Sequence, residues 1–236
     1  MSKPKAVVSL FDLTGAMCRP WADAGVTCFL FDRQHDCDSI YPNMVTTGGD
    51  ASTWAADLAE IFAAYDVQCL FSFPECTQLA ISGNRWRVAK AAANPRYIEE
   101  AMSLVYLGRD YGEQYGVPYM IENPVSVISS EWRKPDYMFN PCDYGGYLPE
   151  VGDVSPHPDI IPPRDAYTKK TCLWTGNGWV MPLPFPVPAV KFQDRNGLNY
   201  SGPAFKLGGK SLRTKNIRSA TPRGFAKAVF AANGHD

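Results

Sequence analysis

The sequence predicts an α/β protein built on a mainly parallel sheet, followed by a smaller, loop-rich and basic C-terminal part. Apolar runs of strand length alternate with helical patterns through the first half of the chain, as in sheets with crossover helices. Half of the twenty prolines then fall within residues 141–190, where they exclude long helices and central strands. Residues 190–236 hold nine Lys and Arg against two Asp, a net charge of +7. This leaves −8 for the rest of a chain whose net charge is −1.

The first elements are short. Residues 6–11 form an apolar, β-branched run, which we expect to be the first strand. A short helix is expected at residues 17–23, because Gly25 then interrupts the pattern. Residues 26–31 are a second apolar run and predict a second strand that ends at Asp32.

A longer helix and two further strands follow. Ser52-Thr53 precede apolar side chains at helical spacing, which predicts a helix with a cap at this position. Residues 67–73 predict a buried third strand, and residues 95–115 predict a second long helix. The apolar strand expected at residues 117–121 ends in Glu122-Asn123-Pro124.

The remaining chain completes the predicted organisation. Within the proline-rich region only residues 171–175 have a strand pattern, and we expect this strand to join the sheet. A closing helix is expected at residues 222–232, with Thr221 as its cap and Pro222 in its first turn. We therefore expect an α/β domain at residues 1–140, a proline-rich, loop-rich segment at 141–216, and a helix within 217–236 that packs back on the α/β domain.

Composition excludes several classes of protein. A hydrophobic content of 45% and a charged content of 20% are ordinary for globular proteins. No apolar run is long enough to span a membrane and the N-terminus lacks a signal-peptide core, so we expect a cytoplasmic protein without a membrane partner. The seven cysteines are scattered, with no Cys-x-x-Cys pair, which favours reduced thiols over a disulfide framework or a metal site.

Cys76 is the candidate nucleophile. It follows the predicted strand at residues 67–73, with Pro74 two residues before it and a Ser-Gly turn after it, so the turn would expose the thiol at the carboxyl end of the sheet. Glu122 ends another strand, and a thiol and a carboxyl group on two strand ends favour covalent catalysis with a proton donor. The alternative is a buried core thiol, which is our interpretation of Cys69 and Cys172.

These residues also carry a family resemblance. Pro74-Glu75-Cys76-Thr77, followed by Leu-Ala-Ile-Ser-Gly at residues 79–83, resembles the catalytic Pro-Cys loop of DNA cytosine-5 methyltransferases, above all their short, phage-type branch. Glu122-Asn123-Pro124 resembles that family's Glu-Asn element, and the resemblance extends with gaps from about residue 6 to residue 230. Glu75 departs from the family, which has a second proline or no residue there.

The resemblance implies a fold and a reaction. The fold would be that of class I S-adenosylmethionine-dependent methyltransferases, which is Rossmann-like, and the protein would methylate C5 of cytosine in DNA, in a host cytoplasm if it is phage-encoded. Cys76 would add to C6 of the ring, Glu122 would protonate or hydrogen-bond ring N3, and Asn123 and Pro124 would shape the substrate side of the loop.

The same resemblance assigns S-adenosylmethionine to the first strand ends. The loop that would cradle it comprises Phe11, Asp12, Leu13, Thr14 and Gly15, with Pro74 facing it, and only Gly15 remains of the family's three glycines. Asp32 lies seventeen residues after Gly15, where an acidic side chain can accept hydrogen bonds from ribose hydroxyls. Asp50 resembles the residue that contacts adenine, although it is equally a helix cap. The absence of Gly-x-Gly-x-x-Gly disfavours a dinucleotide.

Basic residues supply the remaining candidates. Lys169 and Lys170 resemble the family's arginine segment, which binds the cytosine O2. Full-size members insert a large target-recognition domain, for which only residues 177–216 are available here. The candidate substrate contacts are Ser82, Arg85, Lys210, Arg213 and Lys215.

Two other functions remain open. The same chemistry would apply to RNA, a nucleotide or a modified cytosine, or to another group transferred from a derivative of the cofactor, with Arg19 or Arg85 binding an acidic donor group. A non-catalytic nucleic-acid-binding relative is the alternative from another class. The lost glycines favour it, whereas Cys76 and Glu122 oppose it.

Overall fold

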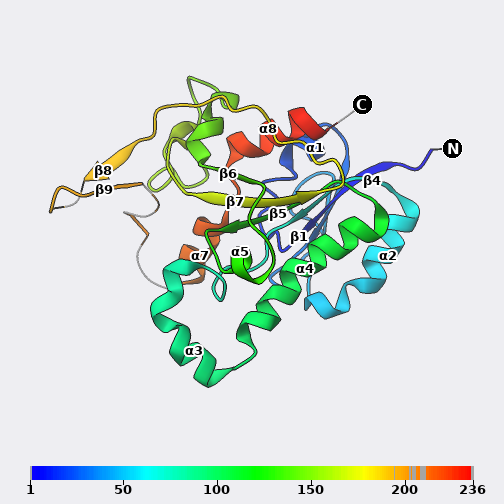
Figure 1. Cartoon of the computed structure of the whole chain (residues 1–236). Helices are drawn as coiled ribbons and strands as arrows, with labels where there is room; N and C mark the ends of the chain where they lie inside the picture. Colours follow the sequence, from blue (N-terminus) through cyan, green and yellow to red (C-terminus); the bar gives the residue numbers. More distant parts are fainter. Residues whose placement is uncertain (1, 194, 202, 204–205, 208–210, 235–236) are drawn as a thin grey trace. The chain divides into compact units, whose positions relative to one another are not determined.

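The computed structural model describes residues 2–193, 195–201, 203, 206–207 and 211–234 (Figure 1). The chain divides into two compact units. The first comprises Met1–Met138 with Thr171–Val180, and the second comprises Phe139–Lys170 with Met181–Asp236.

The first unit contains a seven-stranded sheet with the order β3-β2-β1-β4-β5-β7-β6. Strands β1 to β5 pair in parallel, and β7 runs antiparallel to β5. This confirms the predicted α/β fold with a mainly parallel sheet, and it confirms that the strand expected at residues 171–175 joins that sheet. The strands are β1 (Lys5–Leu10), β2 (Thr27–Phe31), β3 (Met44–Thr47), β4 (Asp66–Ser72), β5 (Tyr119–Pro124), β6 (Tyr137–Phe139) and β7 (Thr171–Gly176).

Helices cover both faces of this sheet. Leu70 belongs to the hydrophobic core under α2 and α4, which lie side by side in Figure 1 and stack Phe62 on Tyr115 at a ring-centroid distance of 4.0 Å. The next residue of β4, Phe71, contacts Trp21 of α1 at 5.2 Å. Successive strand side chains point to opposite faces, so α1 covers the other side. The helices are α1 (Arg19–Asp23), η1 (Ala51–Thr53), α2 (Ala55–Ala64), η2 (Ile81–Trp86), α3 (Arg87–Ala93), α4 (Tyr97–Tyr115) and α5 (Ile128–Glu131).

The second unit is held by a short helix, an ion-pair network and a small core. Arg223 at the start of α8 pairs with Asp153 at 2.7 Å and with Asp165 at 3.2 Å. Phe139 stacks on Phe225 of α8 at 4.0 Å. Its elements are η3 (Pro141–Tyr147), η4 (Pro163–Asp165), β8 (Lys191–Gln193), β9 (Asn199–Ser201), α7 (Leu212–Ser219) and α8 (Arg223–Asn233).

The observed elements correct the sequence analysis in a few places. Strand β3, helices α3 and α7, strand β6 and the β8–β9 pair were not predicted. The cap of α8 is Pro222 and not Thr221, because the Pro222 carbonyl accepts the first helical bond from Ala226 N at 3.0 Å. Within the second unit α8 packs on η3 and η4. Its packing on the α/β domain stays a prediction. None of the helices in the described part of the chain has the length and apolarity needed to cross a membrane.

Candidate active site

The two predicted catalytic side chains come from the ends of neighbouring strands. Cys76 lies four residues beyond the end of β4, and Glu122 is the fourth residue of β5. β4 and β5 are parallel, with Ser72 paired to Ile121, so Glu122 lies just past the last pair of this ladder. The strand pairing therefore brings the Cys76 turn and Glu122 to the same, carboxyl edge of the sheet.

Hydrogen bonds join the Cys76 turn to the segment that follows Glu122. The Asn123 amide donates from Nδ2 to the Pro74 carbonyl at 2.9 Å, and the Asn123 side chain is buried. Beyond the turn, Ile81 N donates to Val125 O at 3.1 Å and Val127 N donates to Leu79 O at 3.0 Å. The turn is thus anchored before and after the cysteine, and both anchors lie on the segment that carries Glu122.

The local fold leaves Cys76 partly accessible and buries Cys69 and Cys172. The Cys76 carbonyl accepts hydrogen bonds from Leu79 N at 3.0 Å and Ala80 N at 2.8 Å, which closes one helical turn directly after the cysteine. Cys76 is half-buried, whereas Cys69 and Cys172 are 1% and 3% exposed. The prediction that these last two are core thiols is confirmed. Glu122 is also half-buried, with its Oε1 atom shielded from solvent.

Glu75, the departure from the family loop, points to solvent. Its carboxylate accepts a hydrogen bond from Thr77 Oγ1 at 2.8 Å and lies 3.7 Å from an Arg33 guanidinium nitrogen. Arg33 follows Asp32 at the end of β2. Because β1 lies between β2 and β4, this ion pair spans the carboxyl end of β1. Arg33 was not predicted as a site residue, because a lone arginine in a loop belongs to no recognisable sequence pattern.

The loop after β1 is closed by Asp12. Its buried carboxylate accepts hydrogen bonds from Ser9 Oγ at 2.9 Å, Thr14 N at 3.2 Å and Gly15 N at 2.8 Å. Burial raises the pKa of Asp12 above its ordinary value, although these hydrogen bonds lower it. The loop amides therefore face inward onto a carboxylate, so they do not form the cradle that a pyrophosphate requires.

The other candidate cofactor residues line the same edge. Phe11 has a φ of 59°, which is rare for a non-glycine residue, and its half-buried ring contacts Trp54 at 5.3 Å. Asp32 is half-buried; its Oδ1 accepts from Gln34 N at 2.8 Å, and no donor in the described part of the chain reaches its Oδ2. Asp50 caps η1 by accepting from Ser52 N at 3.0 Å.

Asp32 and Phe11 have side chains of the kind that could hold a nucleoside. Asp32 has an acceptor oxygen for ribose hydroxyls, and the aromatic face of Phe11 suits a purine. Leu13 is half-buried and Thr14 is exposed in the same loop. Gly15 has a φ of 63°, and a Cβ there would lie 2.8 Å from Leu30 Cδ2 and from Met44 Sδ. The space beside Gly15 is therefore filled by core side chains, so the turn needs this glycine whether or not a ligand is bound.

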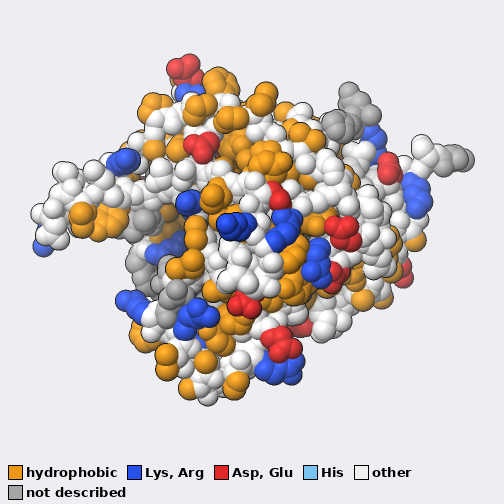
Figure 2. Space-filling view, viewed as in Figure 1, with side chains coloured by type: hydrophobic (Ala, Val, Ile, Leu, Met, Phe, Trp, Pro, Cys, Tyr) orange, Lys and Arg blue, Asp and Glu red, His pale blue; other side chains and the backbone are white. Residues whose placement is uncertain are grey.

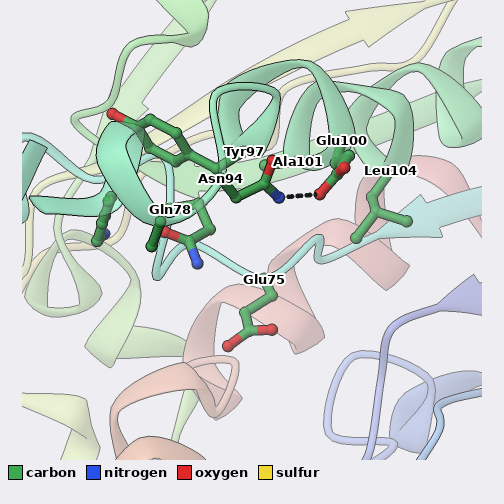
Figure 3. A pocket seen from close by; sticks show the side chains of 9 residues that line it. Glu75, Gln78, Asn94, Tyr97, Glu100, Ala101 and Leu104 are labelled. Atoms are coloured by element: carbon green, nitrogen blue, oxygen red, sulfur yellow. Dashed lines mark hydrogen bonds between the residues drawn. The ribbon is translucent and has the colours of Figure 1, made fainter.

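A cavity of about 300 Å³ adjoins the Cys76 turn. Figure 3 shows Glu75 and Gln78 on the side of the turn, opposite Asn94, Tyr97 and Glu100. Asn94 Nδ2 donates to Glu100 at 2.7 Å across this wall. Neither Cys76 nor Glu122 lines the cavity, so it is a neighbour of the candidate site and not its centre.

The basic candidates are distributed over both units. Arg85 lies in η2 after the Cys76 turn, with its guanidinium 5.2 Å from the Trp86 ring. Ser82 is in the same element, but its side chain is outside the described part, as is all of Lys210. The residues in the second unit are Lys169, which is half-buried, Lys170, which directly precedes β7, and Arg213 and Lys215, which are exposed on α7.

Searches with the whole chain against models of known protein families and against curated proteins give no match.

Proposed function

We propose that this protein transfers a methyl group from S-adenosylmethionine to C5 of cytosine in DNA. The observation that carries the proposal is the hydrogen bond from Asn123 to the Pro74 carbonyl. It links the Cys76 turn, at the edge formed by β4 and β5, to the strand end that bears Glu122. A nucleophile and a proton donor that must act on one ring need this kind of mutual fixation.

The strand order of the sheet and the loop after β1 support the same proposal. The order β3-β2-β1-β4-β5 is that of a nucleotide-binding doubly wound sheet, in which ligands bind where the strand order reverses, here between β1 and β4. The Asp12 carboxylate in place of a phosphate cradle favours a cofactor without phosphates that carries a positive charge, as a sulfonium does.

The chemistry assigned to each side chain follows from cytosine itself. C5 is too weak a nucleophile to take a methyl group directly. Addition of the Cys76 thiolate to C6 makes C5 electron-rich, and a proton shared between Glu122 and ring N3 lowers the barrier to that addition. The cofactor supplies the methyl group. Loss of the C5 proton to a base then expels the thiolate and restores the ring.

Mass spectrometry of nucleosides tests this function. DNA from cells that express the protein is digested, and cytidines are compared with those from cells that express Cys76→Ala. The matched control is Cys37→Ala, which removes an exposed thiol that belongs to no strand end. We expect methylcytosine with the wild type and with Cys37→Ala, and none with Cys76→Ala. Equal methylation with Cys76→Ala would exclude the covalent route, and no modified cytosine with any variant would exclude DNA cytosine as the substrate.

Glu122→Gln separates acid catalysis from folding. The amide keeps the size of the side chain and can still form hydrogen bonds, but it does not deliver a proton. A positioned general acid contributes about 10²- to 10⁴-fold to a rate. We expect a loss of this order in single-turnover methylation, with unchanged cofactor binding by calorimetry.

A further inference from the structure

A two-stranded ribbon in the second unit presents one face made only of polar side chains. β8 and β9 pair antiparallel, with Phe192 opposite Tyr200 in the middle. Side chains alternate along strands, so these two rings share one face and the flanking pairs share the other. The polar face carries Lys191 opposite Ser201 and Gln193 opposite Asn199.

The polar face carries amide groups that can form further hydrogen bonds. Gln193 and Asn199 are both exposed, and Gln193 Nε2 donates to Gly197 O at 3.1 Å. An amide has two donor hydrogens and an acceptor oxygen, so this contact leaves most of the Gln193 capacity for a ligand. Two adjacent amides on an exposed ribbon are not required for packing, and they therefore suit recognition of a partner.

The proline-rich segment contacts the chain on both sides of this ribbon and also packs against α7. Val190 N donates to Ala166 O at 2.7 Å at the base of the ribbon, and Lys206 Nζ donates to Asp159 O at 2.6 Å just after it. The residues that close the small core beneath are Ile160, Ile161, Tyr167, Leu207 and Ile217, the last of which belongs to α7. The segment thus fixes both elements within the second unit.

The charge around the ribbon is strongly positive. Residues 190–219 contain seven Lys and Arg and a single Asp. Arg213 and Lys215 are exposed on α7, and Lys206 lies 4.6 Å from the Phe192 ring. Figure 2 shows hydrophobic side chains on the β8–β9 hairpin with single basic side chains at its margins. A surface of this charge is complementary to a phosphate backbone.

We propose that the polar face of the β8–β9 ribbon reads base edges in the major groove of duplex DNA, while α7 binds the phosphates. The inference rests on the proposed function, which requires an element that recognises DNA around the target cytosine. A two-stranded ribbon fits the major groove of B-form DNA, and Gln and Asn amides pair with the N6 and N7 groups of adenine. Duplex RNA is a poor fit because its major groove is too narrow to be read, and a single strand has no groove.

The phosphate role is tested by the salt dependence of binding. Fluorescence anisotropy measures the full-length protein, without cofactor, on a labelled duplex pool with random bases around one cytosine. Each neutralised phosphate contributes about −0.9 to the slope of log affinity against log salt concentration. Arg213→Gln with Lys215→Gln should therefore reduce the magnitude of the slope by about 1.8. The control, Lys3→Gln with Lys134→Gln, removes the same charge from exposed positions of the first unit. Equal changes in both double variants would overturn the α7 assignment.

The reading role is tested by selection from the same duplex pool. The wild type should enrich duplexes with adenine at a fixed distance from the cytosine. Gln193→Ala with Asn199→Ala should lose about 5- to 150-fold of this preference per contact while keeping the salt slope. The exposed amide Gln114 of α4 gives the control, Gln114→Ala. An unchanged preference in the ribbon variant, or tighter binding of single-stranded DNA or duplex RNA, would refute the inference.

Failure of the two proposals can be told apart. Selective duplex binding without methylcytosine would retain the ribbon inference and remove the proposed reaction. Methylcytosine formed with the same sequence context by the wild type and the ribbon variant would retain the reaction and remove the ribbon inference.

Discussion

Replacement of Asn123 by Asp is the sharpest test of the linked strand ends. The side chain keeps its shape, but the group that faces the Pro74 carbonyl changes from an amide donor to a carboxylate oxygen. Asn123 is 1% exposed, its Nδ2 lies 2.9 Å from Pro74 O, and no donor within the described residues reaches its Oδ1. An ionised carboxylate at this position would therefore be buried beside a carbonyl with no donor to either oxygen.

The size of the effect follows from these contacts. Leaving the buried Pro74 carbonyl without its donor costs about 1–3 kcal/mol, which is the expected loss in unfolding free energy for Asn123→Ala. Asn123→Asp should lose more at neutral pH, because it also buries a charge. When protonated, the acid can donate to the carbonyl as the amide does, so the folded protein raises the pKa of the new carboxyl group above its unfolded value of about 3.9.

The stability of Asn123→Asp should fall as pH rises. Below the unfolded pKa, both states hold the proton, and the variant should approach the stability of the wild type. As pH rises from that value toward the raised folded pKa, the unfolded state loses its proton first, and stability falls by up to about 1.4 kcal/mol per pH unit. Urea unfolding of both proteins between pH 5 and pH 8 measures this difference. Asn196→Asp, at an exposed turn, is the control and should show no such slope. A pH-independent difference between Asn123→Asp and the wild type would refute the reasoning.

Three further changes test the fold and the ion pairs. Gly112→Ala should cost about 1–3 kcal/mol in urea unfolding, because the added Cβ would overlap the Tyr119 ring; no change would mean that β5 and α4 are further apart. Asp153→Asn should flatten the acid limb of the stability curve. Burial raises the pKa of Asp153, but the bonds from Arg223 and Arg164 N outweigh it and lower the pKa, so this contribution is present above the unfolded pKa and lost as pH falls through the folded one. If Asp153→Asn had the same acid limb as the wild type, Asp153 would not contribute to the acid sensitivity of the fold. Glu75→Gln should change the free energy of unfolding by less than about 1 kcal/mol, since the ion pair of Glu75 with Arg33 is exposed. A larger loss of stability would show that Glu75 fixes the Cys76 turn.

The long elements of the first unit were predictable because their patterns depend on burial. β4 contains the apolar run 69–71, β5 begins with the apolar run 119–121, and α4 has an apolar stripe. The strand end before Cys76 and the one that carries Glu122 therefore followed from the sequence. α3 could not be predicted in this way, because none of its residues is buried and its alanines carry no periodic signal. The role of Asn123 depends on a loop 49 residues away in sequence, which no local pattern encodes.

The second unit was harder to predict for a related reason. Its prolines correctly excluded long helices, but its order comes from contacts such as Arg223 with Asp153, 70 residues apart. The β8–β9 ribbon did have a local signal. Asn196-Gly197 lies between Lys-Phe-Gln and Asn-Tyr-Ser, an arrangement typical of a hairpin turn between short strands.

The position of β7 has a consequence for synthesis of the chain. In the sheet β7 separates β5 from β6, yet it is made after both, and residues 140–170 of the second unit lie between β6 and β7 in sequence. A nascent chain that ends before Thr171 therefore leaves the Glu122 strand with an open edge, where another chain can pair. The ribosome must release residues 140–170 before this edge of β5 can be covered. Premature termination within them would yield an aggregation-prone fragment and not a smaller folded protein.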